Sequence, residues 1–229
     1  GFAVPDWNPP PPPSPAPMEG HYCRVERLIP HVHTEALFAA NTLDTDGSMW
    51  TYLAYGPFDT LENYRRWADD ACHGSDPLFY AIVDQATNRA AGVASYMRID
   101  SRHGTIEVGH IAFSPLLQRS PAATEAMYLM MKQAFELGYR RYEWKCNALN
   151  LRSRVAAQRL GFSFEGVFRQ AAVVKGRNRD TAWYSALDTE WAALKDAFEA
   201  WLAPVNFDEH GIQRLQLSAL TGPLLKQRG

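Results

Sequence analysis

Hydrophobic and polar positions repeat with two different periods along the chain, and each period predicts one kind of element. In the first half the pattern predicts strands and helices in the order strand 22–29, helix 34–41, helix 60–71, then strands 78–84, 91–100 and 105–113. Thr34 is a candidate cap for the first of these helices, and Asp59 or Thr60 for the second. In the second half it predicts helix 122–137, strand 141–147, helix 151–160, strands 162–174 and 180–187, and helix 190–202. Because a run of strands precedes alternating helices and strands, we expect an α+β protein with a mixed sheet.

The two ends of the chain have a different character from this patterned domain, which we place at residues 21–203. Residues 1–20 are proline-rich and predict an extended tail. A stiff, solvated leader is the usual outcome, and the alternative is a partner-docking segment or a strap anchored on the domain by Trp7. Residues 204–229 are a weakly patterned C-terminal extension. The apolar stripe of helix 190–202 either packs on the sheet or, with this extension, forms a homodimer contact.

Composition and charge exclude several classes of protein. Lys and Arg number 23 against 25 Asp and Glu, a formal net charge of -2, so we expect no nucleic-acid partner. No apolar run approaches the roughly 18 residues of a membrane span, and no signal-peptide pattern is visible. The three cysteines, Cys23, Cys72 and Cys146, are odd in number and far apart, which argues against disulfides and a metal site. We therefore expect a cytoplasmic protein that binds no metal.

Two segments carry candidate chemistry. In the first, strand 105–113 leads through a loop to a helix start, where Ser120 suits the cap and Pro121 the first helical position. Free N–H groups at such a start attract anions, although an ordinary capped helix is the more common outcome. In the second, Asn147, Asn150 and Ser153 share one face where a strand gives way to a helix. Capping residues and an exposed serine are the alternative there.

Together these segments resemble the GNAT superfamily of acyl-CoA-dependent N-acetyltransferases, and most closely the branch typified by ribosomal-protein N-terminal acetyltransferases. The resemblance covers about residues 22–190. It is carried by Glu107-Val-Gly-His-Ile-Ala-Phe-Ser-Pro, by Gln118-Arg-Ser-Pro-Ala-Ala-Thr, by Asn147-Ala-Leu-Asn-Leu-Arg-Ser, and by Arg159-Leu-Gly-Phe. It implies a mixed, mostly antiparallel central sheet of about seven strands flanked by helices. One position departs from the family pattern: Pro121 stands where the phosphate loop usually has glycine, which removes one N–H donor.

The resemblance also implies the reaction, in which acetyl-CoA is the co-substrate and its acetyl group passes directly to a primary amine. The acceptor would be a protein N-terminus or a small amine. The residues implied at the acyl group and the phosphate loop are Ile111, Ala112, Phe113, Gln118, Arg119, Ser120, Ala122, Ala123 and Thr124. Asn150 would hydrogen-bond the pantetheine amide, Asn147 would serve the acceptor or the cofactor arm, and Ser153 would lie beside the CoA sulfur.

The general base has two candidates. Glu107 is the first, and simple alternation places it on one strand face with Gly109, Ile111 and Phe113. His110, predicted on the other face, is the rival because its ordinary pKa lies near neutrality. The alternatives are a cross-strand ion pair for Glu107 and a buried structural role for His110.

The acceptor side is less defined by the sequence. Aromatic residues that either line an acceptor pocket or pack in the core include Tyr52, Tyr55, Phe58, Trp67 and Trp183, with Arg169 beside them. The basic segment 175–180 is a solvated hairpin tip by default, or else meets an acidic acceptor or the CoA 3′-phosphate. A non-catalytic CoA-binding or interaction module is the competing function, motivated by Pro121 and the proline tail. A general α+β binding domain without a CoA site is the third.

Overall fold

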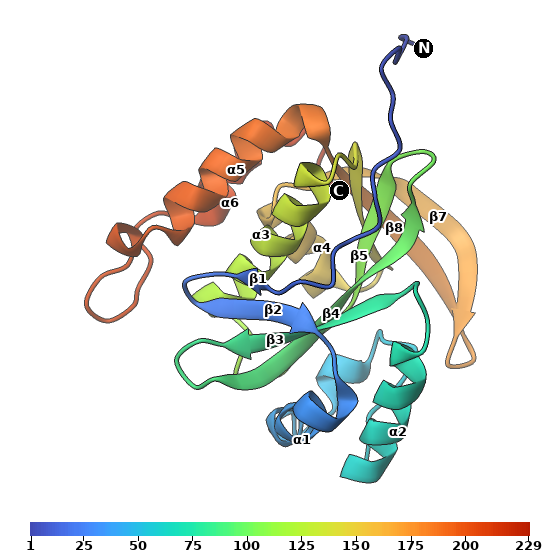
Figure 1. Cartoon of the computed structure of the whole chain (residues 1–229), viewed down its shortest axis with the longest axis vertical. Helices are drawn as coiled ribbons and strands as arrows, with labels where there is room; N and C mark the ends of the chain where they lie inside the picture. Colours follow the sequence, from blue (N-terminus) through green and yellow to red (C-terminus); the bar gives the residue numbers. More distant parts are fainter.

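A single mixed sheet of eight strands organises the chain, and the computed structural model describes all of residues 1–229 (Figure 1). The strands are β1 (Met18–Glu19), β2 (Cys23–Arg27), β3 (Leu78–Asp84), β4 (Arg89–Asp100), β5 (Thr105–Phe113), β6 (Arg141–Asn147), β7 (Ser163–Val174) and β8 (Arg177–Leu187). Their order across the sheet is β1-β2-β3-β4-β5-β6-β8-β7. Only the β5–β6 pair is parallel. The predicted mixed, mostly antiparallel α+β fold is confirmed, with the short β1 as an additional strand.

Helices cover both faces of the sheet (Figure 1). The α-helices are α1 (Pro30–Asn41), α2 (Leu61–Cys72), α3 (Pro121–Glu136), α4 (Leu151–Arg159), α5 (Asp188–Leu202) and α6 (Leu217–Thr221); short 3-10 turns are η1 (Ser48–Trp50), η2 (Pro204–Asn206) and η3 (Gly222–Leu224). On β3, Tyr80 and Ile82 enter a larger core with α3 and α5, whereas Phe79 and Ala81 enter a smaller core with α1 and α2. Successive side chains of β3 thus enter opposite cores, and burial on both faces explains why residues 78–83 form an unbroken apolar run.

The predicted helix caps are largely those of the structure. The hydroxyl of Thr60 accepts from the Asn63 amide at 3.2 Å, and that of Ser120 accepts from the Ala123 amide at 3.1 Å. The start of α1 is a correction, since it begins at Pro30 rather than at a Thr34 cap. Proline suits the first helical position, and the Thr34 hydroxyl instead donates to the Pro30 carbonyl inside the helix.

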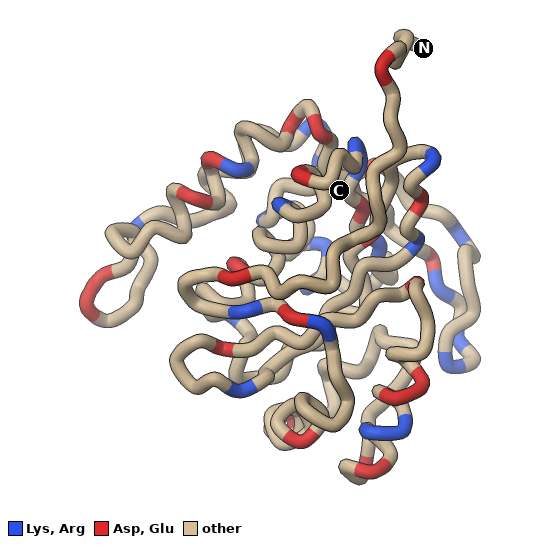
Figure 2. The backbone as a smooth tube through the Cα atoms, viewed as in Figure 1, with Lys and Arg blue, Asp and Glu red and all other residues tan.

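The N-terminal tail is packed on the domain, so the solvated-leader interpretation is wrong and the strap is the correct one. The indole N–H of Trp7 donates to the carbonyl of Arg102 at 3.0 Å. Pro10 and Pro13 are buried, and Met18 reaches the larger core as part of β1. Ion pairs do not attach the tail to the domain, because Asp6 is its only charged side chain before Glu19 (Figure 2).

The C-terminal extension is packed as well. The apolar stripe of α5 enters the larger core through Leu194, Phe198 and Trp201. Leu217 of α6 is fully buried in the same core, and the amide of Phe164 on β7 donates to the Gln227 carbonyl at 3.0 Å. The stripe is therefore used within the chain. None of the helices combines the length and the apolar character needed to span a bilayer.

Candidate active site

Strands β5 and β6 separate before they end, and this opens a gap in the middle of the sheet. Their parallel ladder runs from Thr105 opposite Arg141 to Val108 opposite Trp144, and then stops. Yet β5 continues to Phe113 and β6 to Asn147. The facing edges beyond the ladder carry backbone donors and acceptors that do not pair with each other. An extended ligand inserted there can use those groups as another strand would.

A β-bulge shapes the β5 side of this gap. Gly109 lies opposite Ser95 and Ala112 opposite Val93, so β5 has one residue more than β4 between these pairs. His110 takes up the difference with φ of +50°. The bulge also corrects the predicted faces. His110 lies on the same face as Glu107, towards α1 and α2, while Ile111 and Phe113 turn to the larger core. Strict alternation fails because it assumes that no residue is inserted.

The loop after β5 presents backbone N–H groups at the start of α3. The amides of Arg119 and Ala122 donate to no group in the chain. Arg119 has φ of +59°, which turns the backbone sharply ahead of the Ser120 cap. Gln118 braces the loop by donating from its side-chain amide to the Phe113 carbonyl at 2.7 Å. Free N–H groups and the helix dipole together favour an anionic group at this point.

The three polar residues at the β6–α4 corner also have structural partners. The side-chain oxygen of Asn150 accepts from the Ser153 amide at 3.1 Å, and that of Asn147 accepts from the Leu149 amide at 2.9 Å. The hydroxyl of Ser153 accepts from the Trp144 indole at 2.9 Å. The predicted capping role is therefore present. The side-chain NH₂ groups of both asparagines donate to nothing in the chain, so they are available to a ligand.

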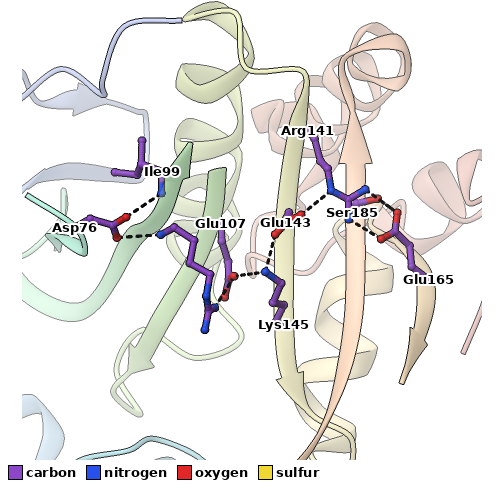
Figure 3. Close-up of polar contacts among 9 residues, drawn as sticks. Asp76, Ile99, Glu107, Arg141, Glu143, Lys145, Glu165 and Ser185 are labelled. Atoms are coloured by element: carbon purple, nitrogen blue, oxygen red, sulfur yellow. Dashed lines mark hydrogen bonds and ion pairs between the residues drawn. The ribbon is translucent and has the colours of Figure 1, made fainter. Parts of the chain in front are cut away.

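Glu107 lies within a chain of charged side chains that crosses the sheet (Figure 3). This chain is on the sheet face that is directed towards α1 and α2. The Glu107 side chain is 4% exposed, and its carboxylate binds Arg98 at 2.7 Å and Lys145 at 2.8 Å. Lys145 also binds Glu143 at 2.6 Å and lies 3.8 Å from the centre of the Trp183 ring. The cross-strand ion pair left open as an alternative for Glu107 is thus present. The parallel β5–β6 ladder puts Glu107 beside Glu143, and Lys145 is two residues further along the same face of β6.

The chain of charges continues across the sheet through Arg141. Burial would raise the pKa of Glu143, but its hydrogen bonds from Arg141 and Lys145 outweigh burial and lower that pKa below its ordinary value. Hydrogen bonding from Arg141 likewise lowers the pKa of Glu165, at the far end of the chain. Both carboxylates are accordingly ionised at neutral pH. They keep this face of the sheet polar where no helix covers it.

An open hollow of about 520 Å³ adjoins this network. Its lining includes Asp76, Arg98, Asp100, Glu143, Lys145 and Trp183. Sequence reasoning missed Arg98 and Lys145 as site residues. A signal for Lys145 was present, since Arg141, Glu143 and Lys145 alternate in charge along one face of a strand. The hollow gives a charged ligand access to the face that carries Glu107.

Aromatic side chains flank the bulge on the same face. The ring of His110 is stacked 5.6 Å from Tyr55 and lies 4.9 Å from Phe79. Burial, helped by the charge of Arg98, lowers the pKa of His110, so its imidazole is neutral at pH 7. Of the predicted aromatic set, Tyr55, Phe58 and Trp67 pack against the smaller core. These three are therefore core residues, which was the alternative to an acceptor pocket, while Trp183 packs on Lys145 at the hollow.

Known proteins with this architecture identify the class. The family model of the acetyltransferase (GNAT) domain matches residues 26–163. A GCN5-related N-acetyltransferase from Brucella melitensis is 49% identical, with a TM-score of 0.92, over 95% of this chain and 99% of that one. A probable acetyltransferase of the GNAT family from Chromobacterium violaceum is 40% identical, with a TM-score of 0.79, over 84% of this chain and 96% of that one. The chain belongs to the GNAT family and is an acetyltransferase.

More distant structures share the fold alone. One is RimL, a ribosomal L7/L12 alpha-N-protein acetyltransferase, at 20% identity and a TM-score of 0.65 over 75% of this chain and 94% of that one. No curated protein matches the chain. The GNAT family uses acetyl-CoA as its acetyl donor, which suits the gap beside β5 and the N–H groups at the start of α3.

Proposed function

We propose that this enzyme transfers an acetyl group directly from the thioester of acetyl-CoA to the primary amine of a small molecule or a protein N-terminus. The observation that carries the proposal is the β5–β6 gap, which opens beside the His110 bulge. The free N–H groups of Arg119 and Ala122 follow the same end of β5. A donor with an anionic pyrophosphate and an extended amide-bearing arm has the groups that such a site can bind.

Most of the predicted cofactor residues have a role in this proposal. The loop from Gln118 to Thr124 holds the pyrophosphate through backbone N–H groups, and the arm lies in the gap with Asn150 as a side-chain donor. A strand N–H at Ile111 or Ala112 faces the thioester oxygen, where a preorganised donor stabilises developing negative charge by several kcal/mol. The hydroxyl of Ser153 retains a proton to donate towards the sulfur. A thiol with a pKa of about 8.5 leaves readily, so a weak donor is sufficient.

Deprotonation of the acceptor is the remaining chemical task. At pH 7 roughly a tenth of an α-amine is neutral, against less than about a thousandth of a lysine amine. Glu107 and His110 lie on the same face of the sheet, so the position of either side chain is compatible with the role of general base. Arg98 and Lys145 both bind Oε2 of Glu107, so neither cation occupies Oε1, whereas His110 is buried and neutral. The rate of acetylation by Glu107→Gln and His110 variants separates the two.

The competing proposal, a CoA-binding or interaction module without turnover, is favoured by Pro121 alone. Calorimetric titration of acetyl-CoA, with desulfo-CoA and ATP as controls, tests the site first. We expect micromolar binding specific to the CoA forms, followed by CoA thiol release with at least one member of an amine panel. Binding without turnover over a wide panel supports the module. No binding at millimolar concentration contradicts both and leaves a domain without a CoA site.

A further inference from the structure

The β7–β8 hairpin projects from the sheet as an exposed arm. Val173 near its tip is 78% exposed, and Phe168 is 56% exposed. The tip turns at Lys175 and Gly176, which have φ of +48° and +72°, as a tight two-residue hairpin turn requires. Among residues 171–178, Lys175 is the only one with a hydrogen bond to a residue outside the β7–β8 hairpin. The position of the tip therefore depends on one side chain.

The ammonium of Lys175 holds a loop on the other side of the site. It donates to the carbonyls of Trp50 at 3.0 Å, Tyr55 at 3.3 Å and Gly56 at 2.9 Å. Three donors meet three acceptors, which is the full capacity of an ammonium. The carbonyls belong to residues 50–56, which run from the last residue of η1 into the loop that precedes α2 (the 50–56 loop). Because the Lys175 side chain is at the surface, water can replace these bonds and the contact is reversible.

The same loop is attached to both sides of the β5–β6 gap. The ring of Tyr55 stacks on His110 at the β5 bulge, at 5.6 Å and 15°. The hydroxyl of Tyr52 donates to the carbonyl of Leu149 at the β6–α4 corner, at 3.1 Å. With Lys175, the loop has three attachments, to β5, to the β6–α4 corner and to the β7–β8 arm. It thus spans the gap on the face that carries Glu107 and His110.

Two polar groups around this space have no partner. The hydroxyl of Tyr55 and the indole N–H of Trp183 are both buried without a hydrogen bond. Buried polar groups are normally satisfied, so a polar ligand in the adjoining hollow is the natural partner for the Trp183 indole. Trp183 also lines the open hollow of about 520 Å³, which gives a route from solvent to the covered face.

We propose that Lys175 is a specificity-determining residue, which latches the 50–56 loop over the acceptor site. This inference rests on the proposed function. With the latch closed, an amine reaches the bulge only from the side of the hollow, so the acceptor is a slender, flexible group such as a small amine or an unfolded chain end. An amine held against a folded surface is excluded. Releasing the latch admits it.

The test compares Lys175→Met with Arg177→Met as the matched control. Arg177 is exposed on the same hairpin and makes no side-chain hydrogen bond or ion pair. The two acceptors are a tripeptide and a small folded protein whose rigid N-terminus has the same three residues. We expect Lys175→Met to lower the kcat/KM ratio of tripeptide to folded protein on the order of tenfold, as the loss of charged hydrogen bonds permits. The Kd of acetyl-CoA and the Arg177→Met ratio stay unchanged.

Hydrogen exchange provides the second readout, independent of turnover. Amides in residues 50–56 should exchange faster in Lys175→Met than in the wild type or Arg177→Met. Unchanged exchange overturns the latch, and faster exchange with an unchanged acceptor ratio overturns its role in specificity. If no amine is acetylated by any of the proteins, the proposed function fails and the specificity role with it, while the exchange data still show whether the loop is latched.

Discussion

Glu107 joins a solvent-exposed cation to a buried one, since the Arg98 side chain is 59% exposed and that of Lys145 is 7% exposed. Glu107→Gln leaves Lys145 with Glu143 as its only carboxylate and returns Arg98 to water. We expect the free energy of unfolding to fall by about 1–3 kcal/mol, measured by urea denaturation. If Glu107 is the base, amine acetylation is also lost while acetyl-CoA binds as before.

Glu143→Gln is the matched control for this variant. It breaks the same buried chain at the neighbouring residue on β6, where Glu143 binds Lys145 and Arg141. A similar loss of stability with turnover retained assigns the effect on acetylation to Glu107 itself. Equal losses of turnover in both variants contradict a role of Glu107 as base and indicate that the network as a whole positions the site.

His110 makes stability depend on pH in a defined direction. Burial lowers its pKa in the folded state below the ordinary value of about 6.5, so the unfolded chain binds the proton more readily. The contribution is fully present above pH 6.5 and is lost as the pH falls through the folded pKa. His110→Asn tolerates the positive φ and removes the titration. We expect a shallower slope of unfolding free energy between about pH 5 and 7.

The exposed His31→Asn serves as the control and should leave that slope as in the wild type. Parallel slopes in the wild type and His110→Asn would show that another group is responsible.

Single residues were predictable where the cause is local. Ser120 was predicted as a cap, and Thr60 as one of two candidates with Asp59, because a helix start and its capping side chain are neighbours in sequence. The face of His110 was not, because an inserted residue leaves no mark on the alternation of side chains. Lys145 also escaped notice, since its partner Glu107 lies on another strand and only the parallel ladder brings the two together.

The start of α3 gives a prediction about the phosphate loop. Pro121 fixes the first helical residue and lacks the N–H that the usual glycine would supply. Pro121→Gly adds an N–H donor beside the free amide of Ala122 and raises the conformational entropy of the unfolded chain. We expect acetyl-CoA to bind about 3- to 10-fold more tightly by calorimetry, with a stability loss of about 0.4–1 kcal/mol.

Ala122→Gly, which adds no donor, is the control for this change and should leave the Kd as it is. An unchanged Kd in Pro121→Gly as well would mean that the missing N–H does not face the pyrophosphate.

The positions of strands and helices in the sequence were predicted better than the pairing between strands. Periods of two and 3.6, together with unbroken apolar runs such as residues 78–83, located every strand from β2 to β8 and five of the six α-helices, because burial leaves a pattern of apolar positions in the sequence. The length of the β5–β6 ladder was not encoded in either period. It follows from the bulge and from the α4 corner, which draw the strands apart after Val108 and Trp144. The central feature of the site therefore appears only in three dimensions.

The assembly of the ends was the least predictable part. Polyproline composition describes the local shape of residues 9–13 but not what they cover. The partner of Trp7 is a backbone carbonyl 95 residues away, and Leu217 enters the core from a segment with little periodicity. Contacts of this kind depend on the surface that the folded domain presents, which the local sequence does not specify. Trp7 was nonetheless recognisable as the residue that a strap would need.

The strap leads to a prediction about the stability of the whole domain. Trp7 lies on the turn between β4 and β5, where any side chain at Gly104 would overlap its indole. The guanidinium carbon of Arg140 lies 5.8 Å from the centre of the same ring. Trp7→Ala removes this half-buried indole and should lower the unfolding free energy by about 1–2 kcal/mol, hence the Tm by about 2–8 °C. Scanning calorimetry measures both.

Phe2→Ala is the comparison, because Phe2 is 83% exposed and its removal should leave the Tm unchanged. Trp7→Phe divides the effect, since it keeps most of the ring and loses only the hydrogen bond to Arg102. An unaltered Tm in Trp7→Ala would mean that the tail lies on the domain without stabilising it. A lower Tm with an unchanged Kd for acetyl-CoA is the result we expect, because the strap holds the β4–β5 turn, whereas the gap opens at the far end of β5.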